Sequence, residues 1–207
     1  MPPQEIKVFL FDLGNVLVDF NHRIALERIS AFCDKSPADL EKFFFESSVT
    51  GAFERGEVAP EEFFRLVKEA LGLRLGYDSF VSIWNEVFSL NTKNRAVYHI
   101  VNSLRQKYRT ALLSNTNILH YKYLKENFPV FGVLHEQFLS FEMGLVKPQE
   151  QIYEKVIAAL GVLPENIFYT DDRKELVACA GKMGLKGFVF TSAEQLIKDI
   201  SSCGIKI

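Results

Sequence analysis

Short apolar runs that stop abruptly at polar residues are the feature that most constrains the fold of this chain. The first, residues 6–11 (IKVFLF), is almost entirely apolar and ends at Asp12. Fully buried strands of parallel sheets have this continuous apolar character, whereas half-exposed strands alternate. The pattern therefore predicts buried parallel strands at four places in the chain. They are residues 6–11, 110–113, 167–170 and 187–190.

Each of these runs is followed by a polar cluster and then by a helical pattern. Strands that alternate with helices imply right-handed crossovers and a mostly parallel sheet. In such sheets, ligands bind beyond the carboxyl ends of the strands. We therefore expect the polar residues that follow three of the runs to meet at one edge of the sheet. They are Asp12, Ser114, Asn115, Asp171 and Asp172.

The long segment between the first and second runs predicts helices and no comparable strand. Ser36, Pro37 and Asp39 form a helix start, with a capping serine, a proline at the first position and an acid three residues after the cap. Pro60 starts another helix with apolar residues at three- and four-residue spacing, and residues 91–108 predict the helix that leads into the second strand. An insertion of this length, just after a strand end that carries an acid, predicts a helical cap over the site.

The composition excludes several classes of protein. The 207 residues carry 24 Lys and Arg against 26 Asp and Glu, so the net charge of −2 offers no basic surface for nucleic acid. No apolar stretch is long enough for a membrane span, and the start, residues 1–5, is not typical of a secretory signal. Cys33, Cys179 and Cys203 have neither a disulfide framework nor zinc-site spacing. We expect a cytoplasmic protein of one domain with an insertion.

The polar residues at each strand end can also be interpreted as purely structural. An aspartate before a glycine, as in Asp12-Leu13-Gly14, can simply cap a turn, and Ser114 can cap the helix that follows it. A serine hydroxyl and backbone amides that open a helix can equally bind phosphate. Lys147, which precedes another helix, is either solvated or a point charge for an anion. Two adjacent carboxylates indicate a hard cation when they face a third.

The order and spacing of these signals are more specific than any one of them. Together, the segments FDLGNVLVDF, LSNTN, KPQEQIY and DD resemble the motifs of the haloacid dehalogenase-like hydrolase superfamily, from Ile6 to the end of the chain. The amino-acid sequence of these segments is most similar to that of a bacterial branch of sugar-phosphate phosphatases of the glucose-1-phosphate type. It is also similar to the phosphatase domain of soluble epoxide hydrolases.

The resemblance implies a fold and a division of the chain. The fold is α/β, a Rossmann-like three-layer core with a mostly parallel sheet and an inserted all-helical cap. Residues 1–17 and 93–207 would form the core, and residues 18–92 the cap. Most of the aromatic residues of the insertion, such as Phe43, Phe44 and Phe45, are then expected to pack inside the cap.

The resemblance also implies a reaction. Asp12 would be the nucleophile that accepts a phosphoryl group from a small phosphorylated metabolite. Mg²⁺ would be held by Asp12, the backbone carbonyl of Gly14 and Asp172, with Asp171 as a further candidate ligand. The residues that would stabilise charge on the transferring phosphoryl oxygens are Ser114, Asn115 and Lys147.

One position departs from the family pattern. Most phosphatases of the superfamily carry a second aspartate two residues after the nucleophile, which acts as general acid and base, but here that position is Gly14 and the next is Asn15. General acid–base catalysis contributes about 10²- to 10⁴-fold. The loss favours substrates with good leaving groups, such as sugar 1-phosphates. Asp19 either substitutes for the missing acid or is a hinge residue of the cap.

The cap and the loop after the second strand offer candidates for specificity. The turn Glu54-Arg55-Gly56-Glu57 either presents Arg55 or Glu57 over the site or is a solvated surface turn. Asn117, with its neighbours Thr116 and His120, could face the leaving group, although His120 is more typical of a satisfied helix residue. His22, His99 and His135 lack metal-ligand spacing.

Three functions compete at this point. The first is a Mg²⁺-dependent phosphatase of sugar phosphates, working as a monomer or weak homo-oligomer without nucleic-acid or membrane partners. The second is a 2-haloacid dehalogenase, which also uses a strand-end aspartate and needs no metal. The third is a catalytically weak protein that binds phosphometabolites. Asp171 and Asp172 form the fourth and last of the family motifs. Dehalogenases tend to lose the acid of this motif, so its presence here favours the phosphatase.

Overall fold

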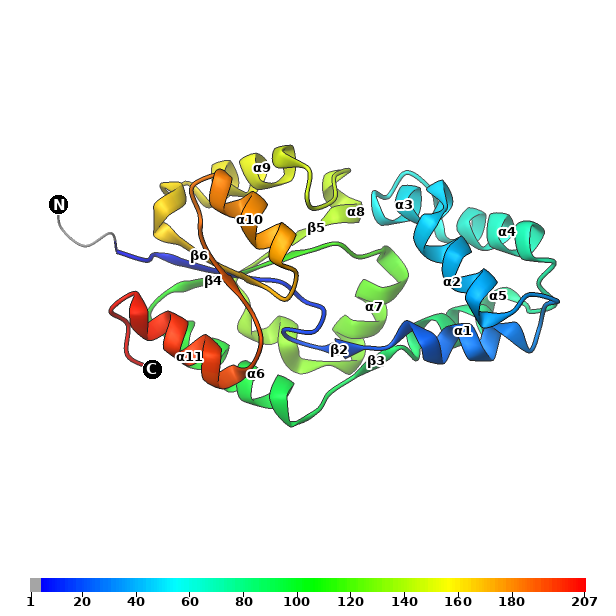
Figure 1. The fold of residues 1–207 in the computed structure, drawn as a ribbon, viewed down its shortest axis with the longest axis horizontal. Helices are drawn as coiled ribbons and strands as arrows, with labels where there is room; N and C mark the ends of the chain where they lie inside the picture. The colour runs from blue at the N-terminus through cyan, green and yellow to red at the C-terminus, as the bar shows by residue number, and fades with distance from the viewer. Residues whose placement is uncertain (1–4) are drawn as a thin grey trace.

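A computed structural model of the chain describes residues 5–207, so Met1 to Gln4, which belong to the expected core and to the start discussed above, lie outside the described residues. Over that range, five parallel strands form one sheet in the order β5-β4-β1-β6-β7 (Figure 1). The strands are β1 (Val8–Phe11), β4 (Arg109–Ser114), β5 (Glu136–Leu139), β6 (Ile167–Asp171) and β7 (Lys186–Val189).

Helices cover both faces of this sheet, which gives the expected three-layer α/β fold (Figure 1). Along β1, Phe9 and Phe11 point to one face and pack in a cluster with apolar residues of α6 and α11. Val8 and Leu10 alternate to the other face and pack with α9 and α10. The helices of the two faces are α6 (Thr92–Leu104), α7 (Ile118–Asn127), α9 (Glu150–Leu160), α10 (Lys174–Lys182) and α11 (Ala193–Ser202).

The edge strand β5 was not predicted from the sequence. Its residues, EQFL, are mostly half-buried, and it pairs with β4 alone, in the register Ala111 to Glu136. An edge strand of this kind lacks the all-apolar run on which the prediction of the other strands rests. The chain reaches β5 through a 3₁₀ turn (Pro129–Val133) and leaves it through the short helix α8 (Ser140–Met143).

The insertion after β1 contains helices, as expected, and in addition two short strands. β2 (Asp19–Phe20) and β3 (Phe88–Ser89) pair antiparallel where the chain leaves the sheet and returns to it. The insertion is therefore not purely helical. Its helices are α1 (His22–Ser30), α2 (Pro37–Glu46), α3 (Ser48–Glu54), α4 (Pro60–Leu71) and α5 (Tyr77–Asn85).

Local signals account for where these helices begin. Ser36 Oγ accepts a hydrogen bond from Asp39 N, and Asp39 Oδ2 accepts one from Ser36 N, so α2 starts with a full capping box. Pro60 stands at the first turn of α4, and Gly72 ends that helix in the left-handed region at φ 62°. Asn91 caps α6 in the same reciprocal way, which places its start one residue after the predicted position.

The insertion has an apolar core of its own, distinct from the two clusters on the sheet. Phe53 and Phe63 stack at 4.1 Å between ring centroids, and Trp84 packs against Phe44 at 4.7 Å. The expectation that the phenylalanines pack inside the insertion is right for Phe44, whereas Phe45 is 55% exposed. Because this core includes Leu119 of α7, the helices of the insertion are anchored on the sheet side as well.

No helix within residues 5–207 combines the length and apolar character that a membrane-spanning segment requires.

Candidate active site

The polar residues that follow the strands meet at one edge of the sheet. β1 lies between β4 and β6, so Asp12, Ser114 and Asp171 come from three neighbouring strands at their carboxyl ends. Carboxylate oxygens of Asp12, Asp171 and Asp172 all lie within 4.8 Å of one another. The topology thus assembles an acidic cluster from residues far apart in the sequence.

Lys147 crosses this cluster from the loop before α9. Its Nζ donates to Asp12 Oδ1 and to Asp171 Oδ2, each at 2.6 Å, and its side chain is only 2% exposed. Burial raises the pKa of Asp12 from its usual 3.8 to about 6, although Lys147 opposes this shift. Burial would lower the pKa of Lys147, but the two carboxylates outweigh it and the pKa is raised. The lysine therefore stays charged beside a carboxylate that can act as a nucleophile.

Asp171 and Asp172, the two acids at the end of β6, have different surroundings. Asp171 Oδ2 also accepts from the Tyr169 hydroxyl at 2.5 Å, and Asp171 Oδ1 accepts from Arg173 N at 3.0 Å. Asp172 is half-buried and accepts, at Oδ2, one hydrogen bond of 2.8 Å from Asn15 Nδ2. Asp171 is thus committed to holding Lys147, while Asp172 keeps an oxygen for a cation. Three clustered carboxylates suit a hard ion such as Mg²⁺.

Asn115, which follows β4, holds the backbone of Lys147 beside the end of that strand. Its side chain accepts from Lys147 N at 2.7 Å and donates to Lys147 O at 2.9 Å. Ser114, which is buried, precedes it at the end of β4. This reciprocal pair holds a hydroxyl, an amide and an ammonium group at the same edge, which is the donor set that an anionic oxygen group requires.

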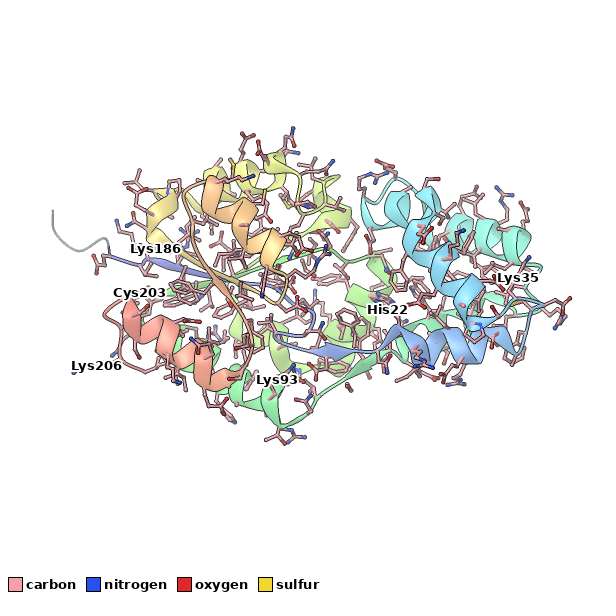
Figure 2. All side chains as sticks on the ribbon, viewed as in Figure 1. His22, Lys35, Lys93, Lys186, Cys203 and Lys206 are labelled. Atoms are coloured by element: carbon pink, nitrogen blue, oxygen red, sulfur yellow. The ribbon has the colours of Figure 1, made fainter. Side chains whose placement is uncertain are left out.

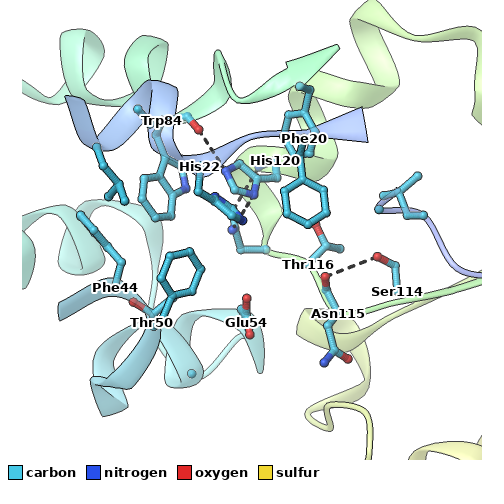
Figure 3. Close-up of a pocket in the computed structure, with 18 of the residues that line it drawn as sticks. Phe20, His22, Phe44, Thr50, Glu54, Trp84, Ser114, Asn115, Thr116 and His120 are labelled. Carbon is cyan, nitrogen blue, oxygen red and sulfur yellow. Dashed lines mark hydrogen bonds between the residues drawn. The ribbon is translucent and has the colours of Figure 1, made fainter. Parts of the chain in front are cut away.

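A cavity of about 230 Å³ separates these strand ends from the insertion (Figure 3). Its sheet side is formed by the turn after Asp12 and by residues 114–117, and its far side by α1, α2, α3 and α5. A space of this size is just below the usual range for ligand pockets, so it suits a small metabolite. Polar and ionisable lining residues from the insertion are His22, Ser47, Thr50, Glu54 and Trp84.

Three polar atoms around this cavity are buried without a partner in the described part of the chain. They are Ser47 Oγ, Thr50 Oγ1 and Trp84 Nε1. Buried polar groups are normally hydrogen-bonded, and each exception calls for an explanation. Because their residues line the cavity, a ligand that carries hydroxyl groups is a candidate partner for these atoms.

The family model described as haloacid dehalogenase-like hydrolase matches residues 6–182. The chain belongs to the haloacid dehalogenase-like hydrolases.

Relatives of this hydrolase include a D-ribitol-5-phosphate phosphatase from Bacteroides thetaiotaomicron, 26% identical over 88% of the chain and 91% of the relative. A solved haloacid dehalogenase family enzyme from the same organism, in complex with magnesium and inorganic phosphate, is 27% identical with a TM-score of 0.80; the match covers 90% of this chain and 95% of that one. An L-2-haloacid dehalogenase has the same fold, with a TM-score of 0.61 at 17% identity over 87% of this chain and 82% of its own.

Phe20 packs against Gly14, the position at which this hydrolase departs from the family pattern. A Cβ atom added to Gly14 would lie 2.4 Å from Phe20 Cε1 and 3.0 Å from Phe20 Cδ1. The phenyl ring itself is held against His22, at 4.8 Å between ring centroids. The space that a side chain at position 14 would use is therefore filled by Phe20.

We expect that Gly14→Ala and Gly14→Asp both destabilise the hydrolase, by about 1–3 kcal/mol, because the new Cβ overlaps a packed ring. The added Phe20→Ala substitution should recover much of the stability of the alanine variant, because it removes the overlap. Urea unfolding of the single and double variants checks this. An unchanged free energy of unfolding in Gly14→Ala would show that the ring moves freely.

Asp19 does not reach the cavity. It forms an ion pair with Lys93 Nζ at 2.7 Å and accepts hydrogen bonds from the side chains of Asn91 and Asn94. Lys93 lies near the start of α6, where the insertion rejoins the core (Figure 2), and it also donates to Asn15 O at 3.1 Å. These contacts favour the hinge interpretation of Asp19 over that of a substitute acid.

Arg55 is not among the residues that line the cavity. Its guanidinium forms two exposed hydrogen bonds with Glu57, at 2.7 and 2.8 Å. The residue of this turn that lines the cavity is Glu54, which was not singled out from the sequence. The turn therefore contributes Glu54 to the cavity wall, while Arg55 and Glu57 bind each other.

Asn117 and His120 line the cavity but are engaged structurally. Asn117 Oδ1 caps α7 by accepting from Leu119 N and His120 N, and its Nδ2 donates to His120 Nδ1 at 3.1 Å. His120 Nε2 must then carry the proton that it shares with Trp84 O at 3.1 Å. Burial lowers the pKa of His120 to about 3, so the ring is neutral. Both residues shape the wall rather than exchange protons.

Proposed function

We propose that this hydrolase is a Mg²⁺-dependent phosphatase that releases inorganic phosphate from small phosphorylated metabolites through an aspartyl-phosphate on Asp12. The observation that carries the proposal is the buried contact of Lys147 with Asp12, inside a cluster of three carboxylates. A nucleophile with a fixed cation on one side and a place for a second cation on the other suits a dianionic phosphate. A singly charged haloacid does not need that arrangement.

Within this proposal, the Asp12 carboxylate attacks phosphorus in line with the leaving oxygen. Ser114, the amide of Asn115 and Lys147 bind the phosphoryl oxygens and stabilise charge that develops on them. Asp171 keeps the lysine in place. Mg²⁺, held by Asp12, the Gly14 carbonyl and Asp172, would neutralise repulsion between nucleophile and substrate when bound. Water then releases phosphate from Asp12.

The cavity supports sugar or sugar-alcohol phosphates as the substrate class. Its unpartnered atoms on Ser47, Thr50 and Trp84 offer hydrogen bonds to hydroxyl groups of the leaving group. The relative that is 26% identical is named for a sugar-alcohol 5-phosphate, an ester of a primary alcohol. We propose that this hydrolase accepts the same kind of ester, beyond the 1-phosphates that its sequence favours.

We further propose that residues 18–92 act as a cap that closes over the phosphate site. The cavity is formed by residues of a single chain, so a monomer or weak homo-oligomer would suffice for catalysis.

Assays of phosphate release from sugar and sugar-alcohol phosphates, with Mg²⁺ titrated from zero, test the proposal. We expect saturable activation in the wild type and a weakened activation curve in Asp172→Ala, because a hard cation loses one of its few protein oxygens. In parallel, 2-chloropropionate with chelator should release no halide. Halide release without metal, together with no phosphate release, would identify a dehalogenase instead.

A further inference from the structure

Phosphate esters of primary alcohols require a proton donor, which position 14 does not provide. An alkoxide is a poor leaving group, so the oxygen must be protonated as its bond to phosphorus breaks. Gly14 has no side chain, and Phe20 occupies the space beside it. The donor must therefore come from another wall of the cavity.

Glu54 lies on that other wall. It is the last residue of α3, and it lines the same cavity as Gly14, Ser114 and Asn115. Figure 3 shows its carboxyl group among the residues that line the cavity, with His22 above it in that view. Within residues 5–207 its carboxyl group forms neither a hydrogen bond nor an ion pair, whereas its neighbours Arg55 and Glu57 bind each other.

The backbone around Glu54 is fixed to the phosphate-binding side of the molecule. Ser140 Oγ lies 2.7 Å from Glu54 O and 2.8 Å from Thr116 O, and it accepts from Thr116 N at 2.9 Å. The buried serine thus joins the insertion to the loop that follows Ser114. The contact with Ser140 therefore fixes the backbone of Glu54 relative to the loop after Ser114.

A close backbone contact makes a second anchor. Gly56 adopts φ +69°, and a Cβ there would lie 2.1 Å from Phe141 O. Only glycine allows the turn to approach α8 so closely. The turn after α3 is therefore seated against the core at two points, which holds the Glu54 side chain toward the strand ends.

Among Glu54, His22 and His120, which all line the cavity, Glu54 is best suited to carry a proton. Burial raises the pKa of Glu54, opposed by Arg55 on its own turn and by Arg173 after β6. His22 of α1 and His120 of α7 share the cavity, but burial lowers their pKa values to about 4 and about 3. The two imidazoles are thus neutral at the pH where a carboxylic acid of raised pKa still holds part of its proton.

We propose that Glu54 is the general acid and base of this hydrolase, in place of the aspartate that position 14 lacks. The inference rests on the proposed phosphatase function. As Asp12 Oδ bonds to phosphorus, the electron pair of the breaking P–O bond stays on the leaving oxygen, which takes the proton of Glu54 and departs as an alcohol. Glu54, now ionised, accepts a proton from the water that attacks phosphorus. The P–O bond to Asp12 breaks, and phosphate and the acid form of Glu54 are regenerated.

The test compares wild type, Glu54→Gln and the matched control Glu61→Gln on two kinds of ester in Mg²⁺. One is a primary sugar-alcohol phosphate, and the other is a series of substituted phenyl phosphates with leaving groups of graded acidity. Glu54→Gln should lose about 10²-fold or more in kcat on the alkyl ester and only a few-fold on 4-nitrophenyl phosphate, because an acidic phenol leaves without help. Glu61→Gln, at an exposed glutamate of α4 that does not line the cavity, should match wild type throughout.

Three readouts separate this role from a structural or binding role. The dependence of rate on leaving-group acidity should be shallow in wild type and steep in Glu54→Gln. The fall of kcat with rising pH, as Glu54 loses its proton, should disappear in the variant. Turnover of 4-nitrophenyl phosphate shows that the variant is folded.

Equal losses on all esters, or a change in KM alone, would overturn the proposal. Because the wild-type series is informative by itself, a steep wild-type dependence would overturn it even if the variant failed to fold. Absence of phosphate release from every ester in wild type would instead contradict the proposed function.

Discussion

Asp12→Asn is expected to abolish phosphate release, by about 10⁴-fold or more, while the chain stays folded. An amide has nearly the shape of a carboxylate but cannot form the covalent intermediate. In the metal-free protein, burial raises the pKa of Asp12 to about 6, so the ionised carboxylate is disfavoured in the folded state. The free energy of unfolding therefore falls as pH rises between the unfolded pKa, 3.8, and about 6.

This linkage predicts that the asparagine variant is at least as stable as wild type at neutral pH. Lys147 keeps Asp171 as its partner in the variant, since both contacts are 2.6 Å in the wild type. Thermal unfolding without metal measures the stability, and a phosphate assay measures the activity. A folded variant with near-normal turnover would exclude Asp12 as the nucleophile.

The second large effect is expected from Lys147→Met, which should lose about 10³-fold in activity and about 3–5 kcal/mol in stability. Removing the ammonium leaves Asp12 and Asp171 buried and facing each other without a cation. It also removes a charge that would stabilise the transferring phosphoryl group.

Urea unfolding with and without Mg²⁺ separates the two consequences of this substitution. Mg²⁺ should raise the free energy of unfolding more in Lys147→Met than in wild type, because it supplies part of the missing positive charge. Lys155→Met, at an exposed lysine of α9, is the matched control and should behave as wild type. Stability equal to wild type without metal would mean that the buried contacts are not maintained in solution.

The sheet-side half of the candidate site could be predicted because its residues follow buried strands directly. Continuous apolar runs identify β1, β4 and β6, and parallel topology brings their carboxyl ends together. The placement of Asp12, Ser114 and Asp171 then follows from chain order alone. The same reasoning does not reach β5, whose residues 136–139 carry the mixed polarity of a strand at the sheet edge.

The insertion-side half could not be predicted because it depends on how the insertion sits on the core. The turn at residues 54–57 contains three charged side chains, and local sequence does not distinguish the one that faces inward. The pairing of Arg55 with Glu57 and the contact of Gly56 with Phe141 decide that it is Glu54. Ser140, which contacts Glu54 across 86 positions of sequence, likewise gains its role only in three dimensions.

The stereochemical course at phosphorus tests the central claim, the covalent role of Asp12, most directly. A substrate ester made chiral at phosphorus by isotopic and sulfur substitution would be hydrolysed in isotopically labelled water, and the configuration of the product analysed. Two successive in-line displacements, first by Asp12 and then by water, each invert phosphorus, so this account predicts net retention. Net inversion would show a single direct attack by water and would contradict an aspartyl-phosphate intermediate.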